Sequence, residues 1–87
     1  MENKIHFPVY RKYAHNRTFF KITSVSEFEE LQIIGHSYSI HHIKAKILPD
    51  RNFITDMLFD YERNWLAIES LEYENKLKEC EEKLRRR

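Results

Sequence analysis

Five histidines give this chain its clearest metal-binding potential, because imidazole is the commonest metal ligand in proteins. They are His6, His15, His36, His41 and His42. On an extended strand His36 and His42 would lie roughly 20 Å apart at ~3.3 Å per residue, and adjacent histidines would point to opposite faces. Zinc needs three or four convergent ligands, and the histidines show neither His-x-His nor His-x-x-x-His spacing. We therefore expect no metal site and no cofactor.

Two carboxylates, Asp56 and Asp60, are spaced for one face of a helix. Such a pair can act as acid and base or bind a divalent cation. That chemistry requires a pocket that perturbs one pKa, and no pattern in the sequence indicates one. A solvent-exposed helix face is the better interpretation.

The candidate nucleophiles are Cys80, Ser37 and Ser39. Cys80 lies among charged residues with no histidine in its segment, so little stabilises a thiolate there. No nucleophile elbow surrounds the serines, and the single glycine, Gly35, cannot form a phosphate-binding loop. We expect the protein not to be an enzyme.

Cations alternate with aromatic rings near the start of the chain. The residues are Tyr10, Arg11, Lys12, Tyr13, Arg17 and Lys21. Proteins bind single-stranded nucleic acid with such sets, because cations neutralise phosphates and rings stack on bases. The same residues are also ordinary strand material, so nucleic-acid binding is an alternative function here.

Length and composition indicate one soluble domain over residues 1–87. Charged residues make up 33% of the 87 and there are one Gly and two Pro, which argues against disorder. No apolar run approaches the roughly 18 residues that span a bilayer. The first residues lack a secretory signal, and Cys80 alone cannot form an intrachain disulfide, so we expect a cytoplasmic protein.

Charge is unevenly distributed although the net charge is only +1. Residues 1–25 are mainly basic, and residues 26–35 and 52–69 are mainly acidic. This segregation suits an anionic ligand or head-to-tail contacts between copies of the chain.

Residues 70–87 are predicted to form a charged C-terminal helix. Five Glu to Lys/Arg pairs have i,i+4 spacing, each worth about 0.2–0.5 kcal/mol in an exposed helix. They are Glu72 with Lys76, Glu74 with Lys78, Glu79 with Lys83, Glu81 with Arg85, and Glu82 with Arg86. Ser70 can cap the first turn.

This helix carries one apolar stripe, formed by Tyr73, Leu77, Cys80 and Leu84. The 4-3-4 spacing is typical of a coiled-coil seam. An isolated helix of this length is marginal in water, so the stripe must pack on the sheet of its own chain or on the same helix of a second copy. We predict the second arrangement, with the stripe as the interface of a homodimer.

The first half of the chain, residues 1–48, reads mainly as strands. Ile5, Phe7 and Val9 alternate with other residues, a turn follows at residues 14–17, and residues 18–23 are rich in strand formers. Residues 24–35 fit either a short helix with a capping box or a strand, and the later part favours a strand. Asp50 or Asn52 can cap a helix over residues 50–62.

The segment from Tyr38 to Leu48 contains a slip in its alternation. Tyr38 and Ile40 occupy even-numbered positions, whereas Ile43, Ala45 and Ile47 occupy odd-numbered ones. A β-bulge at His41–His42 would return them to one face. The alternative is a strand covered on both faces.

Together these patterns predict an α+β fold. A small antiparallel sheet of three to four strands occupies the N-terminal half, and two helices occupy the C-terminal half. We predict that the protein is a small non-enzymatic protein-interaction module that self-associates through its C-terminal helix.

Overall fold

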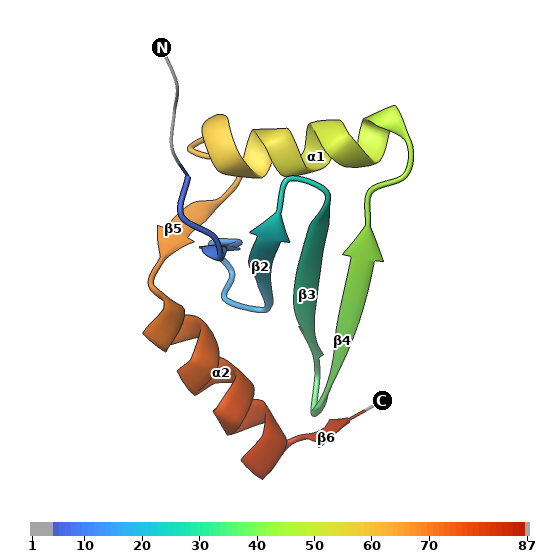
Figure 1. The fold of residues 1–87 in the computed structure, drawn as a ribbon. Coiled ribbons are helices and arrows are strands. Elements are labelled where there is room, and N and C mark those ends of the chain that lie inside the picture. Colours follow the sequence, from blue (N-terminus) through green and yellow to red (C-terminus); the bar gives the residue numbers. More distant parts are fainter. Residues whose placement is uncertain (1–4, 87) are drawn as a thin grey trace.

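The computed structural model describes residues 5–86 (Figure 1). The strands are β1 (Val9–Lys12), β2 (Thr18–Ser24), β3 (Glu27–Ile34), β4 (Ser37–Lys44), β5 (Leu66–Ile68) and β6 (Arg85–Arg86), and the helices are α1 (Leu48–Phe59) and α2 (Ser70–Lys83). In this range no helix is both long enough and apolar enough to cross a lipid bilayer.

The strands in the described range form one sheet with the order β5-β1-β2-β3-β4-β6. Strands β1 to β5 pair antiparallel, whereas β6 lies parallel to β4 beside Ser37 and Tyr38. The predicted α+β fold is therefore confirmed, with more strands than expected. The fifth antiparallel strand, β5, lies between the two helices in sequence and pairs with β1 at the sheet edge.

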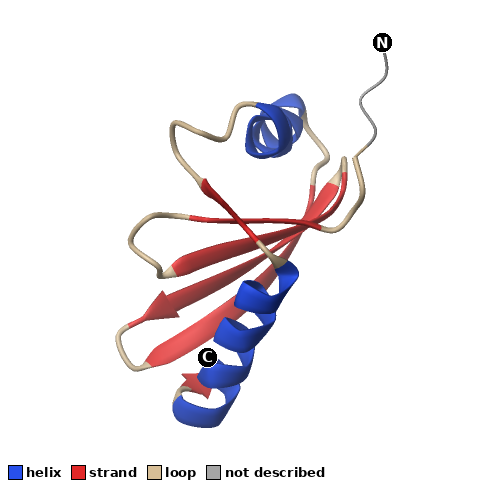
Figure 2. Ribbon diagram, turned by 90° about the vertical axis from the view of Figure 1, so that its left-hand side faces the viewer, coloured by secondary structure: helices blue, strands red, loops and turns tan. Residues whose placement is uncertain are grey.

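The two helices cover opposite faces of the sheet (Figure 2). On β2, Phe20 packs in one apolar core with Met57 of α1, whereas the adjacent Phe19 packs in a second core with Tyr73 of α2. Successive strand residues point to opposite faces, so alternate side chains of each strand pack into the core on one face and the others into the core on the other face. We call these faces the α1 side and the α2 side.

The predicted β-bulge in β4 is wrong. The pairing of β3 with β4 runs without interruption from Glu27 opposite Lys44 to Ile34 opposite Ser37. Tyr38 packs in the core on the α2 side, and Ile43 packs against the core on the α1 side. The apolar residues of β4 therefore change from even to odd positions because the strand is covered on both faces: on the α2 side near its start and on the α1 side near its end.

Residues 24–35 comprise the last residue of β2, a turn at 25–26, strand β3 and Gly35 of the next turn, so the helix alternative for this segment is wrong. Gly35 has a φ of +59° in the turn between β3 and β4, a left-handed conformation that glycine adopts without steric cost. The predicted first strand also starts later than expected, because Ile5 and Phe7 precede Val9, where β1 begins.

Both helices differ from their predicted bounds. Helix α1 begins at Leu48, two residues early, and Ile47 occupies its N-cap position, so neither Asp50 nor Asn52 caps it. Helix α2 ends at Lys83 because the following backbone becomes extended and pairs with β4. Its N-cap position is Glu69 rather than Ser70, and no side chain caps it.

Candidate interaction surface

The apolar stripe of α2 packs on the sheet of its own chain. Tyr73 and Cys80 are fully buried in the core on the α2 side, and Leu77 and Leu84 are half-buried against it. The sequence allowed the stripe to pack either on the sheet of its own chain or on the same helix of a second copy, and the structure has the first arrangement. In this fold the predicted interface residues face the sheet of their own chain and are not available on the surface to contact a second copy.

Two residues of this stripe have shifted pKa values. Burial raises the pKa of the Tyr73 hydroxyl far above its usual value, and the carboxylate of Glu29, which accepts its hydrogen bond at 3.0 Å, adds to the shift. Burial also raises the pKa of the Cys80 thiol, which is free. A raised pKa keeps the thiol protonated at neutral pH, so Cys80 is a poor nucleophile.

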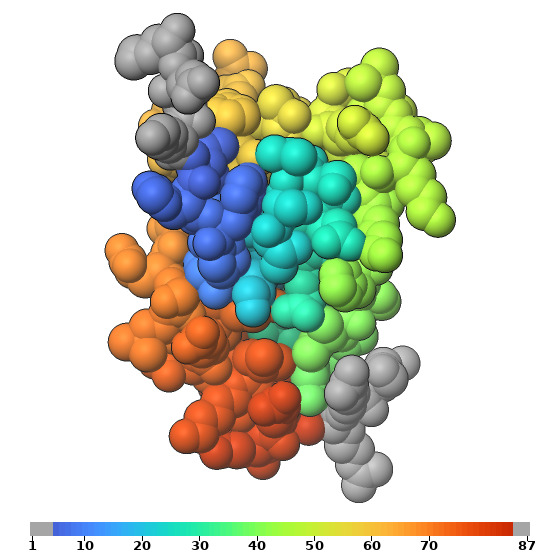
Figure 3. Space-filling view, in the orientation of Figure 1, coloured from blue at the N-terminus to red at the C-terminus, as the bar shows by residue number. Residues whose placement is uncertain are grey.

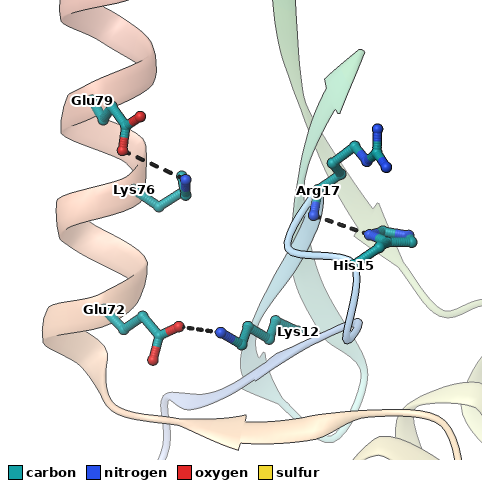
Figure 4. A network of polar contacts seen from close by, with 6 residues as sticks. All are labelled: Lys12, His15, Arg17, Glu72, Lys76 and Glu79. Atoms are coloured by element: carbon teal, nitrogen blue, oxygen red, sulfur yellow. Dashed lines mark hydrogen bonds and ion pairs between the residues drawn. The ribbon is translucent and has the colours of Figure 1, made fainter. Parts of the chain in front are cut away.

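The basic and aromatic residues of β1 and β2 are divided between the two faces. The cross-strand register puts Tyr10 opposite Lys21 and Lys12 opposite Phe19 on the α2 side, whereas Arg11 lies opposite Phe20 on the α1 side. Lys12 forms an ion pair with Glu72 of α2 (Figure 4). Glu72 was predicted to pair with Lys76, but in the structure it pairs with Lys12. Lys76 instead forms an ion pair with Glu79.

Two other members of this set lie near the β1–β2 turn. Tyr13 stacks on Trp65, with ring centroids 6.1 Å apart, and burial together with the nearby Glu30 raises the pKa of its hydroxyl. Arg17 is exposed, and its backbone N–H donates to Nδ1 of His15 (Figure 4). The six residues therefore form no continuous surface, and nucleic-acid binding stays a prediction.

Arg11 has a structural position that its sequence context did not indicate. Its Nε donates to the carbonyl oxygen of Met57 at 2.8 Å, and its guanidinium lies 3.9 Å above the Tyr61 ring. Met57 is in the last turn of α1, where carbonyl groups lack helical partners and the helix dipole favours a cation. Arg11 thus caps α1, and its side chain is buried by that contact.

The remaining candidates for chemistry lie apart. Among residues 5–86 no three His, Cys, Asp or Glu side chains are grouped as metal ligands. His41 contacts the Ser39 hydroxyl at 3.1 Å on the exposed part of β4. Asp56 and Asp60 are both exposed on α1.

One side of α2 carries a hollow of about 470 Å³, open to solvent. We call its lining the α2 flank: Glu69, Leu71, Glu72, Asn75, Lys76 and Glu79. Leu71 is 64% exposed, whereas the other apolar side chains of α2 are buried or half-buried. The sequence signal that could have found it is that Leu71 lies outside the 4-3-4 stripe.

The α2 flank adjoins the free edge of the sheet. Leu66 of β5 is 47% exposed and lies opposite Lys12, which is bonded to Glu72 of the flank. Strand β5 pairs with β1 on one side only in the described structure. Apolar side chains, a hollow and an unpaired strand edge therefore adjoin in one region.

Comparison with known proteins gives no relative: no protein-family model matches the chain, and no curated protein or solved structure matches it significantly.

Proposed function

We propose that this protein is a small non-enzymatic protein-interaction module that self-associates, and that the α2 flank with Leu66 is the surface it uses. The observation that carries the proposal is Leu71, a large aliphatic side chain that is mostly exposed beside an open hollow. Leu66 on the adjoining strand β5 is exposed as well, and exposed apolar side chains with a polar rim are typical of protein interaction sites.

The strand edge beside the flank supports the same surface. Edge strands present unpaired N–H and C=O groups that can pair with another chain. Strand β5 has exposed Leu66 and Ala67, so its edge carries no charge that would oppose association.

The opposite edge of the sheet is less suited to binding. Strand β6 covers only Ser37 and Tyr38, and the rest of the β4 edge carries exposed His41, His42 and Lys44. Charged side chains on edge strands disfavour pairing between chains.

The compartment proposed is the cytoplasm. Cys80 is a free thiol, and cysteines are kept reduced in the cytosol.

Sedimentation velocity over a range of protein concentrations tests the proposal. The wild-type chain is expected to sediment as a dimer or larger assembly. Leu71→Asp should weaken the association at least tenfold, or about 1.4 kcal/mol, since it places a charge at the centre of an apolar contact.

Phe59→Asp is the matched control, because Phe59 is also an exposed large apolar residue but lies on α1. This variant should associate as the wild type does. A wild-type chain that remains monomeric at all concentrations, or a Leu71→Asp variant that associates normally, would contradict the proposal.

A further inference from the structure

A second exposed apolar surface lies at the beginning of α1, at the end of this helix that points away from β5 and α2 in Figure 1. Val25 is 66% exposed, Ile47 60% and Leu48 68%. The backbone N–H of Ala45 donates to the Ser26 carbonyl at 2.7 Å and so holds the β2–β3 turn beside the segment that enters α1. The space-filling view shows these two segments next to each other (Figure 3). We call the surface formed by these exposed residues the α1 corner: Val25, Lys46, Ile47, Leu48 and Arg51.

The charge of the α1 corner is positive. Lys46 and Arg51 are exposed and flank Ile47 and Leu48. Lys44, nearby on β4, is 3.7 Å from Glu27 and is partly neutralised by it. The acidic residue between the two cations is Asp50, which is half-buried in the first turn of α1, where the helix dipole favours a carboxylate.

The charge along α2 is negative. Six glutamates and three lysines lie between residues 69 and 83. Within the flank, Glu72 is paired with Lys12 and Glu79 with Lys76, at 2.5 and 3.5 Å. Glu69 forms no ion pair with any described residue, so the rim of the hollow beside Leu71 keeps an uncompensated carboxylate.

We infer that the partner of the α2 flank is the α1 corner of a second copy of this chain. The inference rests on the proposed function and specifies its geometry. Ile47 and Leu48 enter the hollow beside Leu71, while Lys46 and Arg51 face the acidic rim that includes Glu69. The hollow has a volume of about 470 Å³, which is within the range of about 300–1,000 Å³ found for sites that bind small molecules. Two aliphatic side chains together are no larger than such a molecule, so the hollow accommodates them. Complementary charge fixes the orientation and disfavours pairing of like surfaces.

Such a contact is heterologous, because it joins two different surfaces. Each copy then offers one corner and one flank at separated positions. Two copies close into a dimer if both contacts form at once, and the copies otherwise extend into a chain or ring.

Mixing two variants tests this geometry. Leu48→Asp disables only the corner, and Leu71→Asp disables only the flank. Both positions are exposed, so both variants are expected to keep the wild-type circular dichroism spectrum. Each variant alone should lose association at least tenfold in sedimentation velocity. The 1:1 mixture should form a heterodimer that stops at two subunits, because the corner of the Leu71→Asp chain remains able to bind the flank of the Leu48→Asp chain.

A charge exchange provides the second arm. Lys46→Glu with Arg51→Glu should weaken association, and mixing this chain with a Glu69→Lys variant should restore part of it. Phe59→Asp serves as the control in both arms.

The outcomes separate this inference from the proposed function. If Leu71→Asp abolishes association while Leu48→Asp associates normally, the α2 flank is an interface but the α1 corner is not its partner. If both variants are monomeric and their mixture is also monomeric, the contact is not heterologous and the inference is wrong. A monomeric wild-type chain overturns the proposed function itself.

Discussion

The hydroxyl of Tyr73 on α2 donates a 3.0 Å hydrogen bond to the carboxylate of Glu29 on β3. The Tyr73 ring also lies 5.4 Å from that of Tyr10, so one side chain links the helix to two strands. Glu29 lies between Lys21 and His42 in the cross-strand register, and all three point to the α2 side. The contact therefore fixes where α2 begins relative to the sheet, and with it the position of the α2 flank.

Tyr73→Phe should destabilise the fold by about 1–2 kcal/mol, because hydrogen bonds to charged groups contribute about 1.5–3 kcal/mol and this one is only partly buried. Urea unfolding measures the change. Tyr38→Phe is the control, since Tyr38 is buried in the same core but its hydroxyl forms no such bond to a carboxylate in the described structure. Equal effects of the two substitutions would show that the Glu29 contact adds nothing.

Alkaline pH should destabilise the protein. Burial raises the pKa of Tyr73 in the folded state above its ordinary value of about 10, so the folded chain keeps a proton that the unfolded chain releases. This contribution is fully present below pH 10 and is lost as the pH rises above it. Tyr13 and Cys80 have raised pKa values and act in the same direction.

Thermal unfolding of the wild type and Tyr73→Phe between pH 8 and about pH 11 measures the effect, since tyrosine normally titrates near 10. The wild type should lose more stability than the variant over this range. Parallel curves would contradict the assignment to Tyr73.

Arg11→Ala should destabilise the fold by about 2–3 kcal/mol, because it removes a charge-assisted bond to a helix end and a stacked ring contact. Arg11→Lys should recover only part of the loss, since an ammonium keeps the charge but lacks the planar guanidinium. Chemical denaturation of both variants measures their free energies of unfolding and tests this order. Full recovery by lysine would show that charge alone matters at this position.

Leu77→Glu should lower the stability of the fold by about 1–3 kcal/mol, because the half-buried Leu77 packs in the core on the α2 side. Leu71→Glu, on the same helix but exposed, should change the stability of the monomeric chain by less than about 0.5 kcal/mol. Thermal unfolding of the two variants compares them. Similar melting temperatures would mean that the stripe is not packed on the sheet.

The types of the main elements followed from local patterns. The C-terminal helix was predictable from its charge pairs and its 4-3-4 stripe, and β2 from its aromatic and β-branched residues. These signals lie within single segments, so they are visible without knowledge of the rest of the chain.

Other features depend on which segments meet in space. The parity change in β4 looked like a bulge because the alternation rule assumes one buried face, whereas Tyr38 and Ile43 are covered from opposite sides. Glu72 was expected to pair with Lys76, but the fold brings Lys12 closer. The exposure of Leu71 likewise became apparent only when the stripe was seen to pack inward.

The central claim, that the α2 flank mediates self-association, is tested most directly by an NMR dilution series on ¹⁵N-labelled wild-type chain. Backbone amide signals of Leu71, Glu72 and Asn75 should shift with protein concentration, together with those of Ile47 and Leu48, while signals of the β4 edge stay constant. Spectra that do not change with concentration, or shifts confined to β4, would contradict the account.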